Sequence, residues 1–340
     1  MKTSDFDYDL PQRFIAQTPV EPRDSARMLV LYRSSGVLEH SHFRDLPKYL
    51  KKGDLLVLNE TRVIPARLFA KKIPTGGKVE ILLLRREDNR LWEVLVGGKG
   101  LTVGRELQVE NGPKAVIVAD LDGPKRLIQF DELLSPNLNR FGNVPLPPYI
   151  HEKLDDPNRY QTIYAQDPGS AAAPTAGMHF TDDLMQHLDS AGIQFAKIVL
   201  HIGLDTFLPV TEDDPTEHKI HTEWCRISSS VAEKINTTKR EGHRVIAVGT
   251  TSVRVVESAA RFVSDGGIVS TFEGLTDLFI LPGYNFRVVD AMITNFHLPR
   301  STLIMLVSAF VGRKRILSAY EIAKEEGYRF YSFGDAMLIL

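Results

Sequence analysis

The chain has 340 residues, of which 43% are hydrophobic and 25% are charged, the composition of an ordinary globular protein with room for two domains. A formal net charge of −2 argues against a general binder of polyanions, although a small basic patch can still neutralise several phosphates. The sequence has one cysteine, Cys225, no apolar signal core and no apolar run of about 18 residues, so we expect a cytoplasmic protein without a disulfide or a membrane span.

Residues 1–61 end in the apolar run Leu55–Leu58, which we expect to be a buried strand. Residues 62–149 then contain short runs of β-branched and aliphatic residues, separated by turn signals such as Asn111-Gly112-Pro113. Closely spaced strands with almost no helix favour a small antiparallel barrel. The strands expected there are Val79–Leu84, Leu91–Val96, Glu106–Val109, Lys114–Val118 and Arg126–Phe130.

After Thr175 the pattern alternates between helices and apolar strands. Thr181 is expected to cap a helix that ends at Gly192, and Ile193–Ile202 to form the strand that follows. Further helices are expected at 229–241, after Gly249 to about Val263, from about Ser301 and at 318–327, and further strands at Val245–Val248, Leu278–Leu281, Val288–Thr294 and 335–340. This pattern predicts a mixed-sheet α/β catalytic domain of residues 1–61 and 150–340, with residues 62–149 inserted as a barrel domain.

The segment Pro174–Phe180, written PTAGMHF, is a first candidate for chemistry. Its small residues allow a ligand to approach the backbone, Gly177 permits a positive φ, and His179 stands just before a helix N-terminus. A tight turn with a capping histidine is the alternative interpretation.

The segment Val248–Arg254, written VGTTSVR, runs from a strand through small hydroxyl residues into a helix. This arrangement is typical of sites that hold a phosphate or a carboxylate, although the segment matches neither the P-loop nor the dinucleotide fingerprint. Arg254 and Glu257 lie three residues apart on one helical face, so an ion pair between them is the structural alternative.

The segment Thr294–Ser301, written TNFHLPRS, places Asn295, His297 and Arg300 on a short loop after a strand. Polar groups at the end of a strand commonly line the site of an α/β fold. A helix entry with Ser301 as its cap is the alternative.

Two other histidine-bearing segments are less specific. His218 and His221 lie three residues apart near Glu223, but this spacing lacks the one-face geometry of helical zinc motifs, and we expect no metal site. His201 closes an apolar strand and is by default a core histidine.

Together these segments resemble the S-adenosylmethionine:tRNA ribosyltransferase-isomerase family of the queuosine pathway, along the whole chain. A small departure is Met178, where the family usually has Leu, a volume-conserving change. The segments that carry the resemblance are Asp5–Pro11, Ile15–Gln17, Asp54–Arg67, Pro174–Phe180, Glu217–Glu223, Val248–Arg254, Thr294–Ser301 and Gly327–Met337.

The resemblance implies an α/β fold with an inserted barrel, and transfer and isomerisation of the ribosyl group of S-adenosylmethionine. The acceptor is 7-aminomethyl-7-deazaguanine at the wobble position of a tRNA, and the products are epoxyqueuosine, adenine and methionine. S-adenosylmethionine is a co-substrate, and neither a prosthetic group nor a metal is implied. We expect the protein to act as a monomer, without contact to a membrane.

Residue type and motif position then suggest roles. Proton transfer is assigned to His179 and His297, with His201 and His221 in reserve, and base and acid are left open among them. Substrate binding is assigned to Thr175, Gly177, Thr250, Thr251, Arg254, Asn295 and Asp335, and tRNA binding to Arg62, Arg67, Arg313, Lys314 and Arg315.

Two other functions compete with this one. An S-adenosylmethionine-dependent RNA methyltransferase would use the same donor but would release S-adenosylhomocysteine. A non-catalytic tRNA-binding protein would not consume the donor, and it would leave the histidine-bearing loops without a purpose.

Overall fold

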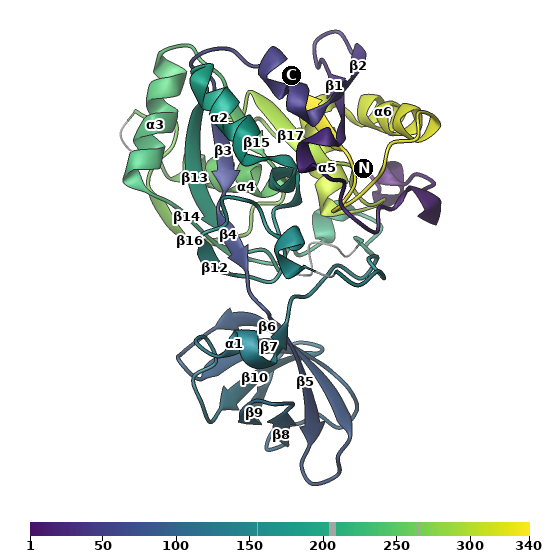
Figure 1. Ribbon diagram of the computed structural model, residues 1–340, viewed down its shortest axis with the longest axis vertical. Helices are drawn as coiled ribbons and strands as arrows, with labels where there is room; N and C mark the ends of the chain where they lie inside the picture. Colours follow the sequence, from purple (N-terminus) through teal and green to yellow (C-terminus); the bar gives the residue numbers. More distant parts are fainter. Residues whose placement is uncertain (155, 204–208, 264–265) are drawn as a thin grey trace. The chain divides into compact units, whose positions relative to one another are not determined.

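The computed structural model describes residues 1–154, 156–203, 209–263 and 266–340. The chain divides into two compact units (Figure 1). One consists of Met1–Thr61, Pro147–Asp167 and Ala173–Leu340, and the other of Arg62–Leu146 with Pro168–Ala172. Within the described ranges, no helix is both long and apolar enough to cross a membrane.

The larger unit is built on a mixed sheet, in which the described residues form nine strands in the order β16-β14-β13-β3-β15-β17-β18-β1-β2. The central strands β13, β3, β15 and β17 are parallel, with Leu55 opposite both Gln194 and Val245. The bounds are β1 (Arg27–Leu31), β2 (Leu38–His42), β3 (Leu55–Asn59), β13 (Gln194–Leu200), β14 (Glu223–Ile227), β15 (Val245–Val248), β16 (Phe272–Thr276), β17 (Ala291–Asn295) and β18 (Ala336–Ile339). The expectation that Leu55–Leu58 joins this sheet is therefore confirmed.

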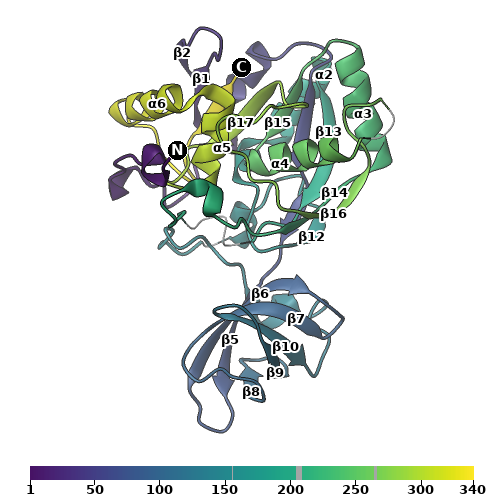
Figure 2. The same ribbon diagram turned by 180° about the vertical axis from the view of Figure 1, so that it is seen from behind.

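Helices cover both faces of the sheet, with α2 on one face and α4 and α5 on the other (Figures 1 and 2). Leu184 and Leu188 of α2 pack with Leu56, Ile246 and Ile293, which are buried side chains of three neighbouring strands. The helices are α2 (Asp182–Ser190), α3 (Ser229–Arg240), α4 (Thr250–Ala259), α5 (Thr302–Val311) and α6 (Arg313–Glu325). Shorter 3-10 turns are η1 (Thr3–Phe6), η2 (Gln12–Phe14), η3 (Arg23–Ser25), η4 (Phe43–Lys48), η5 (Pro157–Tyr160), η6 (Thr175–His179), η8 (Pro215–Glu217) and η9 (Ala260–Phe262).

Local signals fix the ends of α2 and the start of α5. The hydroxyl of Thr181 accepts a hydrogen bond from the N–H of Leu184, and Gly192 takes a φ of +80° after the last turn of α2. Ser301 caps α5 in the same way, by accepting from the N–H of Ile304. All three positions are those expected from the sequence.

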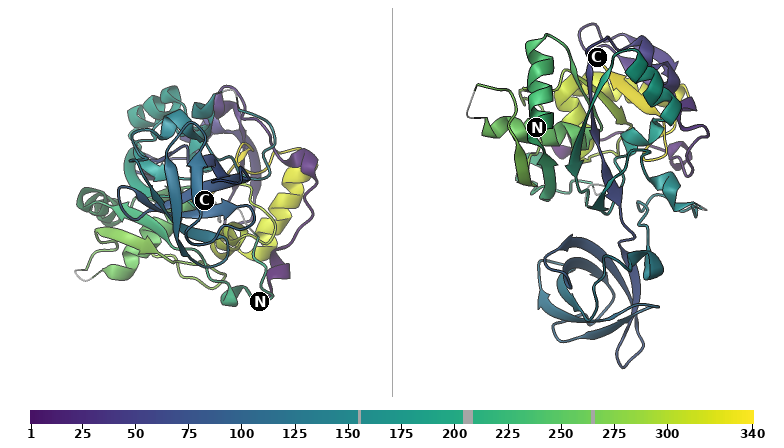
Figure 3. Two further views of the ribbon diagram at one scale, coloured as in Figure 1. Left: turned by 90° about the horizontal axis from the view of Figure 1, so that it is seen from below. Right: turned by 60° about the vertical axis from the view of Figure 1, so that its left-hand side comes forward.

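The smaller unit is an antiparallel barrel (Figure 3). Its strands follow the order β11-β5-β6-β7-β10-β9-β8, and an additional pairing between β5 and β8 closes the ring. The elements are β5 (Arg67–Lys72), β6 (Lys78–Arg86), β7 (Leu91–Gly97), β8 (Glu106–Val109), β9 (Lys114–Asp120), β10 (Lys125–Phe130), α1 (Leu138–Phe141) and β11 (Gly142–Asn143). A separate two-stranded pair is formed by β4 (Thr61–Val63) and β12 (Asp167–Ser170). The expected fold class, a mixed α/β sheet with a small antiparallel barrel, is confirmed.

One expected strand is wrong and another starts late. Residues 278–281 are irregular, and the strand of this region is β16, which ends at Thr276. The guanidinium of Arg254 donates to the carbonyl of Leu278, and the carboxylate of Glu257 accepts from the N–H groups of Val288 and Val289. Because buried side chains of α4 take these backbone groups, they are not available for a sheet ladder, and β17 begins only at Ala291.

Candidate functional site

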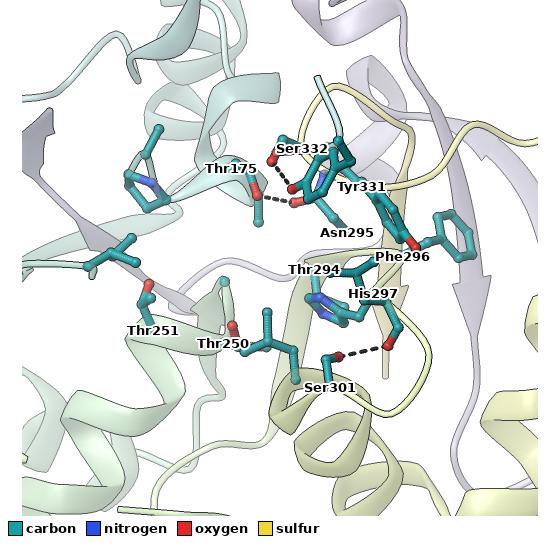
Figure 4. Close-up of a pocket in the computed structure, with 18 residues that line it drawn as sticks. Thr175, Thr250, Thr251, Thr294, Asn295, Phe296, His297, Ser301, Tyr331 and Ser332 are labelled. Atoms are coloured by element: carbon teal, nitrogen blue, oxygen red, sulfur yellow. Dashed lines mark hydrogen bonds between the residues drawn. The ribbon is translucent and has the colours of Figure 1, made fainter. Parts of the chain in front are cut away.

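A pocket in the larger unit opens where the parallel strands β15 and β17 end (Figure 4). The space between its walls, together with the solvent at its open mouth, measures about 610 Å³. Its lining residues are Tyr149, Ala173, Pro174, Thr175, Ala176, Ile202, Gly249, Thr250, Thr251, Thr294, Asn295, Phe296, His297, Leu298, Ser301, Leu303, Tyr331 and Ser332. All three motifs found in the sequence therefore contribute to one cavity.

Asn295, the last residue of β17, connects the PTAGMHF segment to the pocket. Its amide oxygen accepts from the hydroxyl of Thr175 at 2.9 Å, and its amide nitrogen donates to the carbonyl of Tyr331 at 3.2 Å. The same nitrogen lies 3.4 Å from Nε2 of His179, which is buried and stacks at 5.0 Å against Phe43. His179 is thus linked to the pocket through Asn295 and is not itself a lining residue.

His297 lies in the pocket wall, and its backbone and side chain are both held. Nε2 is 2.7 Å from the hydroxyl of Thr294. The N–H of His297 donates to the hydroxyl of Tyr320, and its carbonyl accepts from the hydroxyl of Tyr8. These three contacts fix the position of the imidazole with respect to the cavity.

The N-terminus of α4 forms another part of the wall. Gly249, just before the helix, has a φ of +88°, a conformation that favours glycine. The turn brings Thr250 and Thr251 to the pocket, where the first backbone N–H groups of the helix have no partner within it. Asn59 at the end of β3 holds this corner, because its amide donates to the carbonyl of Leu200 and lies 3.4 Å from the hydroxyl of Thr251.

The pocket is electrically neutral. None of its described lining residues is Asp, Glu, Lys or Arg. Burial lowers the pKa of His297 to about 3. Burial, with the positive charges of Arg329 and Arg23, also lowers the pKa of His179 to about 3. Both histidines are therefore neutral at physiological pH, and His297, which lines the pocket, can hydrogen-bond a ligand without bringing a charge to it.

The structure brings together Thr175, Thr250, Thr251, Asn295 and His297, and it places Gly177 and His179 directly behind them. Gly177 lies in η6 without a positive φ, and its lack of a side chain makes room for the hydroxyl of Tyr164. The expected convergence of the three motifs on a common cleft is confirmed.

Four other expected site residues lie outside the pocket lining. Arg254 forms a buried ion pair with Glu223, so the alternative pairing of Arg254 with Glu257 is wrong. Asp335 is buried and accepts from the backbone N–H groups of Arg27 and Arg329, and burial raises the pKa of its carboxyl.

His201 stacks on Trp224 at 5.1 Å, with Nδ1 2.8 Å from the hydroxyl of Thr61. His221 is exposed and does not line the pocket.

Three hydroxyl-bearing pocket residues do not follow from the sequence motifs: Tyr149, Tyr331 and Ser332. Tyr331 and Ser332 belong to the segment Gly327–Met337, which contributes to the family resemblance but matches no motif that predicts a site. Tyr149 follows Pro145-Leu146-Pro147-Pro148, a segment whose prolines are typical of a stiff linker. The aromatic and hydroxyl residues beside Asp335 were a signal that could have indicated a site.

The residues expected to bind tRNA lie at the surfaces of the two units. In the smaller unit, Arg62 is exposed and Arg67 pairs with Glu80 at 3.0 Å. In the larger unit, Lys314 is exposed, Arg313 pairs with Asp5, and the guanidinium of Arg315 donates to the carbonyl of Arg33.

Comparison with known proteins shows the family. A family model described as queuosine biosynthesis protein matches residues 3–339. The S-adenosylmethionine:tRNA ribosyltransferase-isomerase of Carboxydothermus hydrogenoformans is 55% identical over 343 residues, and that of Moorella thermoacetica is 52% identical over 345 residues, in both cases over 100% of either chain. The chain belongs to the queuosine biosynthesis family.

A solved structure of a similar protein has the same fold. The crystal structure of the S-adenosylmethionine tRNA ribosyltransferase from Thermotoga maritima is similar with a TM-score of 0.58 and 40% sequence identity, over 99% of this chain and 100% of that one. This member of the queuosine biosynthesis family is thus an enzyme of the ribosyltransferase-isomerase type.

Proposed function

We propose that this enzyme transfers the ribosyl group of S-adenosylmethionine to 7-aminomethyl-7-deazaguanine at the wobble position of a tRNA and isomerises it, giving epoxyqueuosine, adenine and methionine. The observation that carries the proposal is the convergence of three separate motifs on one pocket at the carboxyl ends of β15 and β17. This edge of an α/β sheet is where ligands commonly bind.

The N-terminus of α4 suits the methionine carboxylate. Backbone N–H groups at a helix start, together with the hydroxyls of Thr250 and Thr251, offer donors to an anion. Arg254 takes no part in this contact, because its guanidinium is occupied by Glu223. Thr175 and Asn295 are joined by a hydrogen bond and would orient the ribose.

His297 is the proposed proton-transfer group. The positive sulfonium makes the adjacent 5′ carbon acidic, and a neutral imidazole does not repel that charge. The tautomer of the imidazole decides its role. If Nε2–H donates to the hydroxyl of Thr294, Nδ1 carries no proton and is a base. If the hydroxyl of Thr294 donates to Nε2, Nδ1–H is a donor for the departing adenine. His179 would act indirectly, by holding the amide of Asn295.

The tRNA would be bound by exposed cations of both units. Arg62 and Lys314 are exposed, whereas Arg67 and Arg313 would exchange a carboxylate partner for a phosphate. Arg315 belongs to the same basic run as Lys314.

The test is a reaction of the protein with S-adenosylmethionine and a tRNA that carries the aminomethyl base. The expected result is release of adenine and methionine together with a mass increase of the modified nucleoside. Release of S-adenosylhomocysteine would instead show a methyltransferase, and no consumption of the donor would show a non-catalytic tRNA-binding protein. Either result would refute the proposal.

A further inference from the structure

Two tyrosines that the proposed reaction does not yet use face each other in the pocket. The ring centroids of Tyr149 and Tyr331 lie 4.7 Å apart, with an angle of 55° between the ring planes, and both residues line the cavity. Phe296 also lines the cavity, but its ring is fully buried among Tyr320, Tyr328 and Phe330. Phe296 is therefore part of the core, whereas Tyr149 is half-buried and the largely buried Tyr331 keeps 5% of its surface exposed, so these two rings form the aromatic part of the wall that a ligand can meet.

The backbone of Tyr331 is held in an unusual conformation. Its φ of +70° lies in the left-handed region, which a bulky side chain disfavours. Three hydrogen bonds hold it there: its N–H donates to the carbonyl of Phe296, and its carbonyl accepts from Asn295 and from the N–H of Gly334. Residues held in such a conformation by their surroundings cluster at active sites and ligand-binding sites.

Tyr149 is fixed from the other side. Its hydroxyl lies 2.7 Å from the hydroxyl of Ser332, the residue that follows Tyr331. Both aromatic rings are thus set in place before a ligand binds, which lowers the entropy lost on binding. The hydroxyls of Tyr149 and Ser332 also bring hydrogen-bonding groups to the edge of the aromatic surface.

The tyrosine pair and the start of α4 lie on different sides of the cavity. Figure 4 shows Thr250 and Thr251 on one side, and Tyr331 with Ser332 on the other, with Asn295 and Thr175 beside the latter. S-adenosylmethionine has a charged amino-acid end and a planar purine end. A molecule whose carboxylate meets α4 would direct its base away from that helix, toward the tyrosines.

We infer that Tyr149 and Tyr331 form the subsite for a purine base, the adenine of S-adenosylmethionine, which they hold by contact with its ring face. The inference rests on the proposed function. A neutral aromatic surface suits a base because every nucleobase has a π-face, and stacking needs no charge. The absence of charged side chains among the described lining residues agrees with this ligand.

Free adenine is the probe that isolates this subsite, and its affinity is measured by equilibrium dialysis with the full chain. Tyr331→Leu is expected to weaken adenine binding about tenfold, since stacking of a base on an aromatic ring contributes on this order. Tyr331→Phe keeps the ring and should remain within about twofold of the unaltered protein by the same argument. Tyr331→Gly accepts the φ of +70° and should behave like Tyr331→Leu, which excludes backbone strain as the cause.

Phe262→Leu is the matched control, because it removes an exposed aromatic ring that stacks on Phe272 outside the pocket. It should leave adenine affinity unchanged. Equal adenine affinity in Tyr331→Leu and Tyr331→Phe, or no adenine binding by the unaltered protein, would overturn the inference.

A loss of affinity for tRNA with unchanged affinity for adenine would overturn it as well, by assigning the rings to the tRNA base. Adenine release by the unaltered protein in the complete reaction is measured in parallel. If release occurs while the substitutions have no effect on adenine binding, the subsite fails and the proposed function stands; if no release occurs, the proposed function fails.

Discussion

The hydroxyl of Thr294 lies 2.7 Å from Nε2 of His297, three residues further along the chain. Thr294 is the fourth residue of β17, and His297 stands on the loop just after it. This contact joins a rigid strand to the imidazole at the pocket wall. It fixes the ring orientation, and it leaves Nδ1 as the atom whose protonation depends on the tautomer.

The first prediction concerns this pair. His297→Gln should lower kcat by about 100-fold or more, because a positioned acid or base contributes on the order of 10²–10⁴-fold. Thr294→Val keeps the shape of the side chain but removes the hydroxyl, and it should give a smaller loss of kcat with little change in the KM for tRNA. The measurement is steady-state adenine release. Near-normal turnover of His297→Gln, with folding verified, would remove His297 from the chemistry.

The second prediction concerns Tyr8, whose hydroxyl donates a hydrogen bond to the backbone carbonyl of His297. Tyr8→Phe removes the hydrogen bond to the carbonyl of His297 and should lower kcat several-fold, while lowering the free energy of unfolding by about 1 kcal/mol. Tyr32→Phe is the matched control, since the Tyr32 hydroxyl meets only the exposed carboxylate of Glu39 in the described structure. Identical kinetics of the two variants would show that Tyr8 does not position His297.

The third prediction concerns acid stability. His179 and His297 have pKa values lowered to about 3, against about 6.5 in the unfolded chain, so the unfolded state binds more protons between these pH values. Stability should therefore be complete above pH 6.5 and fall as the pH drops toward 3, by up to about 1.4 kcal/mol per pH unit for each histidine.

The measurement is urea unfolding of the protein and of His297→Gln between pH 7 and pH 4. The variant should have a shallower dependence of the free energy of unfolding on pH. Parallel curves for the two proteins would contradict the burial of a neutral His297.

The fourth prediction separates a structural from a ligand-binding role of Arg254. Arg254→Gln leaves the carboxylate of Glu223 buried without its cation, and it should lower the free energy of unfolding by about 3–5 kcal/mol. Arg254→Met combined with Glu223→Met should recover part of that loss, because no buried charge remains. A variant Arg254→Gln of normal stability with reduced affinity for S-adenosylmethionine would show instead that Arg254 binds the substrate.

Much of the fold follows from local signals in the sequence. β8 and β15 have the bounds that their apolar runs predict, and Thr181, Gly192 and Ser301 mark helix ends by their own hydrogen bonds and backbone conformation. The strand expected at 278–281 fails because its backbone is bonded by Arg254, a residue 24 positions away in sequence. Such a contact leaves no trace in the periodicity of the segment.

The sequence predicts part of the candidate site and misses the rest. Motifs at strand ends could be expected to converge, because the carboxyl ends of parallel strands share one edge of the sheet. The ion pair of Arg254 with Glu223 and the backbone contacts of Asp335 depend on tertiary packing, so residue type alone could not separate them from ligand-binding groups. Tyr149 lines the pocket, but the prolines that precede it, at 145, 147 and 148, predict only a linker.

The most direct test of this donor site is a crystal structure of the protein with S-adenosylmethionine bound. We predict the donor in the pocket of the three motifs, with its carboxylate at the N-terminal N–H groups of α4 and its 5′ carbon within reach of His297. Density for the donor at any other place on the molecule, with this pocket filled only by solvent, would contradict it.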